Sequence, residues 1–202
     1  MSIKDRRERQ KEATRSGILS AALEIAKSDG WSAVTIRRVA ERVEYTPPII
    51  YQYFENKDAL LEELQNQGFA LLTERLEAVG WDDEADTAEQ LLDAAEAYVE
   101  FAYDEPELYQ LMHGWSSEAV DLERTLKRAS AAAEVVEDYM SLWVQIYHID
   151  LPDINSALEI AWALLHGLVS VEMMGRIAGG RERVRQLARQ GVENLMFAWA
   201  SK

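Results

Sequence analysis

Residues 35–64 read TIRRVAERVEYTPPIIYQYFENKDALLEEL, and this stretch decides the fold. Four of its apolar residues recur at the three-and-four spacing of one helical face: Ile36, Val39, Ala40 and Val43. Thr35 precedes them, where its hydroxyl can accept a hydrogen bond from a free N–H group of the first turn. The pattern therefore predicts a short helix that begins after Thr35 and leaves Arg37 and Arg38 outside its buried stripe.

A second short helix, from about Pro47 to Tyr53, is predicted after a break in this pattern. Thr46 is placed as its N-cap. Pro47 is the first helical residue, where a missing N–H costs nothing and the fixed φ favours the helix. Ile50 and Phe54 lie four residues apart and suit a buried face. We therefore expect the tyrosines of this helix to project from its other sides.

A third helix is predicted from Asn56 to about Val79. Asn56 can cap it, Lys57 lies in its first turn, and leucines form its inner stripe: Leu60, Leu61 and Leu64. Free N–H groups at such a helix start can bind a phosphate. Helices as short as the first two of this trio depend on each other for stability.

The segment resembles the N-terminal DNA-binding domain of the TetR family of transcriptional regulators. The similarity covers twelve residues in the family's order and spacing: Thr35, Ile36, Val39, Ala40, Thr46, Ile50, Tyr51, Tyr53, Phe54, Lys57, Leu60 and Leu61. A helix from about Arg7 to Ser28 precedes them. Two positions depart from the family, which usually has glycine where Glu44 stands and glycine or alanine where Pro48 stands. These departures predict a stiffer entry to the recognition helix and an unusual base sequence.

The resemblance implies contacts with double-stranded DNA, and ten residues are candidates: Thr35, Arg37, Arg38, Tyr45, Thr46, Pro47, Ile49, Tyr51, Tyr53 and Lys57. Tyr45, Thr46, Pro47 and Ile49 are expected nearest the base edges, where apolar side chains suit thymine methyl groups. Phosphate contact is expected of the other tyrosines and the lysine. The alternatives remain open, because a tyrosine can bury its ring in a core and exposed charges are often only solvated.

The charge is distributed unevenly along the chain. The whole sequence has a formal net charge of −15, whereas DNA-binding proteins usually carry a basic surface. Residues 1–57 hold eleven Lys and Arg against eight Asp and Glu, a net charge of +3, and the remainder carries −18. The positive charge therefore coincides with the DNA-binding motif. Salt screens charges beyond roughly 8 Å, so a distant acidic domain repels DNA only weakly.

Composition predicts a cytoplasmic protein without a membrane partner. The 202 residues are 48% hydrophobic, but we find no run of about 18 apolar residues and no signal-peptide core. The chain has no cysteine, and its three histidines lack metal-ligand spacing, so no metal or other cofactor is expected. Nucleophile, phosphate-loop and metalloprotease motifs are also missing. We therefore expect no catalytic residues and no enzyme activity.

The rest of the chain predicts more helices, and so an all-α fold of two domains. Residues 1–56 form a three-helix domain with a helix-turn-helix, which the start of the next helix completes. Residues 57–202 form a helical domain for ligand binding and dimerisation. Further helices are expected at about Thr87–Tyr103, Pro106–Met112, Glu118–Tyr147, Ile154–Ile177 and Arg181–Ala200.

The last two helices each show two apolar faces, which implies two neighbours. Small residues on one face let backbones approach closely, so we expect this pair to meet its symmetry mate in a four-helix bundle and make a two-fold dimer. The predicted interface is Ala163, Gly167, Ser170, Met174, Leu187, Gly191, Leu195 and Trp199. A monomer with one fully central helix is the alternative.

Trp162, then three residues, then His166 and Gly167 resemble the Trp-His-Gly signature of one class of TetR-family C-terminal domain. In the family this domain binds a small molecule. Candidate contacts are the aromatic, methionine and histidine residues of the region: Tyr98, Tyr109, Met112, Trp115, Met140, Trp143, Tyr147, Trp162 and His166. Such residues suit an apolar pocket, although they are more often part of a core.

These features together predict a ligand-responsive regulator, most simply a repressor. It would bind a near-palindromic operator as a homodimer and be released by a small apolar or aromatic effector. The alternative is a helical protein that binds a small molecule or a partner but no specific DNA.

Overall fold

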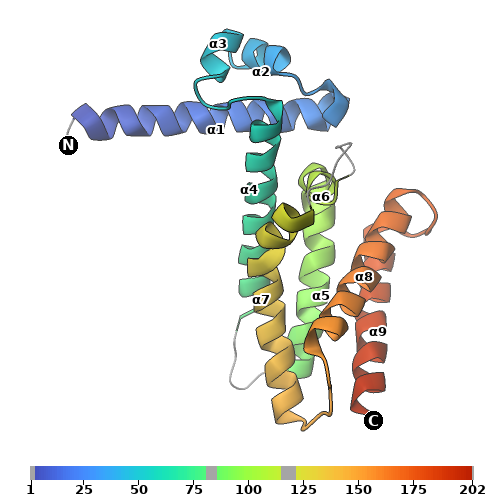
Figure 1. The fold of residues 1–202 in the computed structure, drawn as a ribbon. Coiled ribbons are helices and arrows are strands. Elements are labelled where there is room, and N and C mark those ends of the chain that lie inside the picture. The colour runs from blue at the N-terminus through green and yellow to red at the C-terminus, as the bar shows by residue number, and fades with distance from the viewer. Residues whose placement is uncertain (1–2, 81–85, 115–121, 202) are drawn as a thin grey trace. The chain divides into compact units, whose positions relative to one another are not determined.

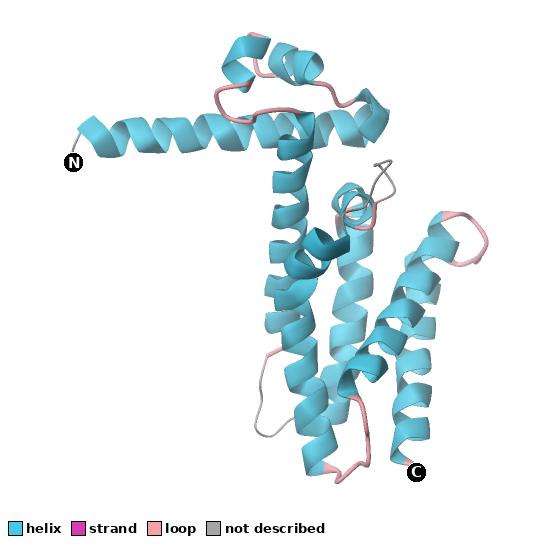
Figure 2. Cartoon of the chain, viewed as in Figure 1, coloured by secondary structure: helices cyan, strands magenta, loops and turns pink. Residues whose placement is uncertain are grey.

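A computed structural model describes residues 3–80, 86–114 and 122–201. Every regular element of these residues is a helix and none is a strand (Figure 2). The helices, labelled in Figure 1, are α1 (Ile3–Asp29), the 3-10 helix η1 (Trp31–Ala33), α2 (Ile36–Arg42), α3 (Pro47–Ile50), α4 (Lys57–Glu77), α5 (Thr87–Asp104), α6 (Pro106–Met112), α7 (Leu122–Ile146), α8 (Ile154–Met173) and α9 (Gly180–Ala200). The predicted all-α fold is confirmed.

The chain forms two compact units. The first consists of Met1–Gly68 and Glu107–Val120, and the second of Phe69–Pro106 and Asp121–Lys202. The domain boundary predicted at residues 56 and 57 lies at the start of α4, whereas the two units divide within that helix. The first unit also includes α6, which lies far along the chain.

The core of the first unit is built from the apolar stripes that the sequence shows. α1 buries Ile18, Leu19, Ala22, Ile25 and Ala26, and the later helices add Val39, Ala40, Ile50, Phe54, Leu60 and Leu64. α2 packs against both α1 and α3. These contacts hold two helices that are too short to be stable alone.

α6 belongs to the first unit through specific contacts with it. The indole N–H of Trp31 donates to the carbonyl oxygen of Glu107 over 3.1 Å, and the Gln65 amide donates to that of Leu111 over 2.9 Å. A Cβ atom on Gly68 would lie 2.6 Å from the Met112 sulfur, so glycine permits the close approach of α4 and α6. Sequence periodicity predicts α6 itself but not this long-range packing.

The second unit packs α7, α8 and α9 against α5. Val99, Phe101 and Ala102 of α5 are fully buried, as are Val184 and Ala188 of α9. Three arginines of α9 form ion pairs with acidic residues of α5: Arg181 with Glu100 and Asp104, Arg185 with Glu96, and Arg189 with Glu89, Asp93 and Glu96. Five acidic side chains of α5 are therefore engaged in holding α5 to α9.

The observed helix bounds differ from the prediction in a few places. α1 begins at Ile3 rather than about Arg7, and α8 ends at Met173 rather than Ile177. The start predicted for α7, about Glu118, lies outside the described residues. The amino-terminal turns of α1 escape detection by periodicity because they bury no apolar stripe.

α8 is long and apolar enough, by length and composition alone, to cross a membrane. Its mean hydropathy reaches 1.4 over an 18-residue window, although the sequence contains no uninterrupted apolar run of that length. Core helices of soluble domains pass the same test, and α8 packs against three helices of the second unit.

Candidate nucleic-acid interface

α2 begins at the predicted cap. Thr35 has extended backbone angles, and its hydroxyl accepts a hydrogen bond from the N–H of Arg38 over 3.2 Å. This bond satisfies one of the free N–H groups of the first turn. Because the Thr35 hydroxyl is engaged in the cap, it fixes the start of α2 in addition to any contact with DNA.

The turn between α2 and α3 is a Schellman motif. The N–H of Tyr45 donates to the carbonyl oxygen of Ala40 over 2.9 Å, and that of Glu44 donates to Glu41 over 3.3 Å. Glu44 adopts a φ of 58°, in the left-handed region where glycine is favoured. This geometry explains why the family usually has glycine at this position, because glycine adopts the left-handed conformation without strain.

α3 is shorter than predicted. Thr46 is its N-cap residue and Pro47 is its first residue, but the Thr46 side chain makes no capping hydrogen bond. The α-helix ends at Ile50 instead of Tyr53, because the N–H groups of Gln52 and Tyr53 donate three residues back, to Ile49 and Ile50. The expected two-turn helix is therefore one α-helical turn followed by tighter turns.

The side chains predicted to meet DNA are mostly accessible. Tyr45 is 43% exposed and Tyr51 is 54% exposed, values that are unusual for tyrosines of a folded core. Thr46 is exposed, while Pro47, Ile49 and Tyr53 are half-buried. Ile50 and Phe54 are buried, as predicted. The turn and α3 thus present aromatic and apolar side chains to solvent on one short segment.

The start of α4 has the predicted cap. The side-chain oxygen of Asn56 accepts a hydrogen bond from the N–H of Ala59 over 2.8 Å. Lys57 is the first residue of α4 and is half-buried. A cation at a helix N-terminus opposes the helix dipole, so an anion bound there would offset the cost.

The arginines of α2 are all engaged with acidic side chains. Arg37 pairs with Glu41 at 2.9 Å, and Arg42 lies 3.6 Å from a carboxylate oxygen of Glu24. Arg38 forms a short ion pair with Asp29 and holds the pKa of that carboxyl below its ordinary value, mainly through their hydrogen bond. The predicted contacts Arg37 and Arg38 are therefore exposed but partly neutralised.

The predicted effector residues do not form one pocket. Tyr109 and Met112 are buried in the first unit, and Tyr98, Met140 and Trp143 are buried in the second. Tyr147 and Trp162 are each 50% exposed. Trp115 lies outside the described residues.

A hollow of about 410 Å³ in the second unit brings two of these residues together. Its lining is Trp143, Tyr147, His148, Ile149, Asp150, Trp199 and Ala200. The hydroxyl of Tyr147 donates to a carboxylate oxygen of Asp86 over 2.8 Å, which raises the pKa of the tyrosine. Trp199, predicted at the dimer interface, thus lies beside two predicted effector residues.

The Trp-His-Gly residues lie along α8. Trp162 and His166 stack with their ring centroids 5.4 Å apart, and the Ser170 hydroxyl lies 3.3 Å from the Nε2 atom of His166. Burial lowers the pKa of His166 below its ordinary value. The histidine is therefore predominantly neutral near pH 7.

The residues predicted at the dimer interface differ in accessibility. Ala163 and Met174 are exposed, and Gly167, Leu187, Leu195 and Trp199 are half-buried. Ser170 is buried within the chain. A Cβ atom on Gly191 would lie 2.7 Å from the Cδ2 atom of Leu164, so this glycine allows α9 to pack on α8 of the same chain.

The exposure of three apolar side chains of α8 and α9 was not predicted from the sequence. Ile160 and Val171 are 50% and 36% exposed, and Phe197 is 75% exposed. The spacing of Ile160, Val171 and Met174 could have revealed a shared helical face. Phe197 gave no such signal, because its accessibility depends on how α9 packs against α5.

Comparison with known proteins identifies two matched regions. Residues 18–64 match the family described as "Bacterial regulatory proteins, tetR family", and residues 91–195 match "Tetracyclin repressor-like, C-terminal domain". These regions include α2, α3 and the start of α4, and most of the second unit.

Individual relatives agree with this result. The uncharacterized HTH-type transcriptional regulator Rv0681 of Mycobacterium tuberculosis is 26% identical over 80% of this chain and 71% of its own length. YobS of Bacillus subtilis, another uncharacterized HTH-type transcriptional regulator, is 29% identical over 48% of this chain, which spans only 50% of that relative. A solved structure of a protein of unknown function from Rhodococcus sp. RHA1 has a TM-score of 0.78 and 22% identity, covering 92% of this chain and 95% of that one.

Proposed function

This chain belongs to the TetR family of DNA-binding transcriptional regulators, and we propose that it is a ligand-responsive repressor that binds a near-palindromic operator as a homodimer. The observation that carries the proposal is the exposed segment from Tyr45 to Tyr51. Tyr45 and Tyr51 are exposed there and Pro47 and Ile49 are half-buried, whereas Ile50 is buried in the core. Exposed aromatic side chains grouped on one short segment suit contact with a partner.

The segment divides into base-reading and phosphate-binding residues. Thr46 has a hydroxyl that is not used in capping, and Pro47 and Ile49 offer apolar contact to thymine methyl groups. Tyr51, Tyr53 and Lys57 supply hydroxyl and ammonium donors for phosphates. A single turn of α3 has few side chains, so sequence preference would rest mainly on these residues and on Tyr45.

The dimer would form through α8 and α9. The exposed Ile160, Ala163 and Val171 lie at helical spacing on α8, the exposed Met174 follows directly after it, and Phe197 is exposed on α9. Exposed apolar patches of this kind are typical of protein interfaces. A two-fold dimer would present two α3 segments to half-sites about 34 to 36 Å apart.

Release would require an effector that favours one arrangement of the dimer over another. We propose a small apolar or aromatic effector bound in the second unit. Its coupling to DNA affinity is expected to be about 1–3 kcal/mol, which corresponds to a change of roughly 5- to 150-fold. The protein would act in the cytoplasm, without catalysis.

Mapping the DNA that the purified protein protects around its own coding region tests the proposal. A footprint with two related half-sites, which weakens when a ligand is added, is the expected result. If no fragment shows specific protection at low salt, with or without candidate ligands, the protein is not a regulator of this kind.

A further inference from the structure

The positive charge of the amino-terminal region lies outside the helix-turn-helix, which corrects the expectation that it coincides with the DNA-binding motif. Residues 1–17 contain six Lys and Arg against three Asp and Glu. Residues 18–57, which include α2 and α3, contain five of each and are neutral overall. The excess of +3 in residues 1–57 therefore comes entirely from the start of the chain.

The helix-turn-helix cannot supply this missing charge from its arginines. Arg37, Arg38 and Arg42 each face a carboxylate, and only Lys57 adds a cation at the start of α4. Affinity for the DNA backbone scales with the number of phosphates that cations neutralise. A protein of this charge distribution needs cations from another element.

The amino-terminal part of α1 is that element. It is helical from Ile3, and its side chains from residue 4 to residue 13 are exposed. Ala13 is the one apolar side chain between residues 4 and 17. A helix without an apolar face has no means of packing on a core or entering a membrane, whereas its charge suits a polyanion.

Different cations lie on two opposite faces of this helical segment. Ile18, Ala22 and Ile25 form the core stripe of α1, and the same stripe continues backward through positions 15, 11, 8 and 4. Lys11 lies on it, and Arg7 lies one turn earlier beside it. Arg6 and Arg9 lie on the opposite face.

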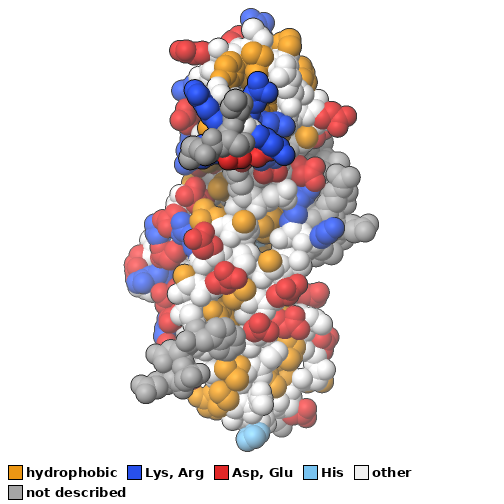
Figure 3. Space-filling model, turned by 90° about the vertical axis from the view of Figure 1, so that its left-hand side faces the viewer, with side chains coloured by type: hydrophobic (Ala, Val, Ile, Leu, Met, Phe, Trp, Pro, Cys, Tyr) orange, Lys and Arg blue, Asp and Glu red, His pale blue; other side chains and the backbone are white. Residues whose placement is uncertain are grey.

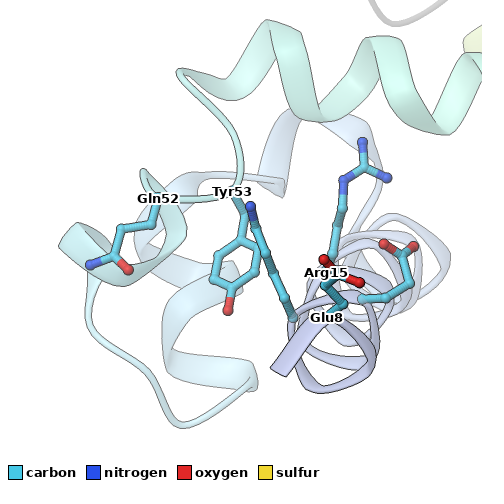
Figure 4. Close-up of a pocket in the computed structure, with 6 residues that line it drawn as sticks. Glu8, Arg15, Gln52 and Tyr53 are labelled. Carbon is cyan, nitrogen blue, oxygen red and sulfur yellow. The ribbon is translucent and has the colours of Figure 1, made fainter. Parts of the chain in front are cut away.

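A hollow places this face next to the end of α3. Figure 4 shows Glu8 and Arg15 of α1 on one side and Gln52 and Tyr53 on the other. The hollow measures about 380 Å³ and is also lined by Lys11 and Glu12. Lys11 therefore shares a surface with Tyr53, a proposed phosphate contact.

Arg15 fixes one side of this hollow. Its guanidinium pairs with Glu63 of α4 at 2.8 Å and lies 5.1 Å from the centre of the buried Phe54 ring. These contacts hold α1 in register with the segment after α3. In Figure 3, which views the first unit toward the start of α1, Lys and Arg side chains gather around that end of the helix, near hydrophobic side chains.

We propose that the amino-terminal part of α1 is a second DNA-binding element, whose Arg7 and Lys11 face binds backbone phosphates next to those contacted by Tyr53. This inference rests on the proposed function, because it needs DNA to lie against α3. It also assigns the electrostatic affinity chiefly to α1 and leaves base reading to the segment after α2.

The test compares two double variants that remove the same charge from opposite faces. Arg7→Gln with Lys11→Gln removes the proposed phosphate contacts, and Arg6→Gln with Arg9→Gln is the matched control. Glutamine favours helix about as well as arginine and lysine, and circular dichroism checks that α1 is retained. Binding to the operator and to a random duplex of equal length is measured at salt concentrations from about 50 to about 200 mM.

Each phosphate contact contributes about 0.9 to the slope of log K against log salt. The Arg7 and Lys11 double variant should therefore reduce the magnitude of that slope by about 1.8 on both duplexes. Over a fourfold rise in salt, its affinity should then fall about twelvefold less than that of the wild type. The control should change the slope much less. Glu8→Gln, which removes a carboxylate beside Lys11, should strengthen binding to both duplexes.

An unchanged salt slope in the Arg7 and Lys11 double variant would overturn the proposal. Equal reductions of the slope in both double variants would also overturn it, because the effect would then come from net charge alone. The random duplex separates this inference from the proposed function. If the wild-type protein shows no preference for any operator, the function fails, but the slopes on the random duplex still decide the role of α1.

Discussion

The backbone N–H of Tyr45 donates to the carbonyl oxygen of Ala40 over 2.9 Å and thereby closes the turn that delivers α3. Glu44, which lies between them, adopts a strained left-handed backbone conformation with a φ of 58° in this turn. The side chains proposed to read DNA bases follow directly after this strained residue. The stability of the turn is thus linked to the placement of the reading side chains.

Glu44→Gly should stabilise the protein. A left-handed conformation costs a non-glycine residue about 1–2 kcal/mol, and the larger unfolded-state entropy of glycine offsets part of the gain. We expect a net rise of about 0.5–1 kcal/mol in the free energy of unfolding, measured by urea denaturation. Glu44→Ala keeps the strained φ and is the control. Equal stabilisation by both substitutions would show that the carboxylate, not the backbone, is unfavourable.

Thr35→Ala and Thr46→Ala should have opposite signatures. Thr35 makes a capping bond to the N–H of Arg38, so its loss should cost about 1 kcal/mol of stability. Thr46 makes no capping bond, so its loss should leave stability nearly unchanged and lower operator affinity. Thermal unfolding without DNA, paired with binding assays, checks both. A clear drop in stability for Thr46→Ala would contradict the geometry of the α3 cap.

Much of the reading segment was predictable because its signals are local. Residue type and spacing alone predict the helix caps at Thr35 and Asn56, the helix start at Pro47 and the burial of Ile50 and Phe54. The unused hydroxyl of Thr46 was not predictable, since capping depends on side-chain orientation within the observed turn.

Long-range packing explains the other differences from the prediction. Gly191 approaches Leu164 of the same chain, and Phe197 remains outside the core, because α9 turns one face toward α5 and α8. The helical extension of α1 was missed for the opposite reason. It has no apolar pattern, and only the charge count and the hollow beside Tyr53 give it a role.

Lys57→Ala should weaken binding to every DNA sequence alike. The loss of one phosphate contact should reduce the salt slope by about 0.9 while the ranking of operator variants is unchanged. Tyr51→Phe should also weaken all sequences equally, since it removes a hydroxyl donor. Affinities for a panel of single-base operator variants, measured at several salt concentrations, provide the readout. A changed ranking with an unchanged slope would move Lys57 out of the phosphate-binding set.

Phe197→Glu should weaken the proposed dimer. Aromatic anchors at the centre of an interface commonly contribute 2 kcal/mol or more, so the dissociation constant should rise at least about thirtyfold. Ile146→Glu is the control, because it changes another exposed apolar side chain, 52% accessible, that lies at the end of α7. Analytical ultracentrifugation over a concentration series measures both. A dimer unaffected by Phe197→Glu would place the interface elsewhere.

His166 should make stability sensitive to acid. Burial lowers the pKa of His166 in the folded chain, so the unfolded chain takes up a proton first as the pH falls through about 6.5. The unfolded state then binds more protons, and the free energy of unfolding falls until the folded-state pKa is passed. His166→Asn should reduce this loss between about pH 7.5 and 5.5, whereas His148→Asn, at an exposed site, is the control. An identical pH profile for His166→Asn and the wild type would contradict this role.

Selection of bound sequences from a random DNA library tests the central claim most directly. Purified wild-type protein should enrich a near-palindrome whose half-sites are about 10 base pairs apart, or a multiple of that spacing. Thr46→Ala should alter the bases enriched within each half-site. Two results would contradict the assignment of base reading to the segment that follows Glu44. The folded protein could enrich no common sequence, or Thr46→Ala could leave the enriched sequence unchanged.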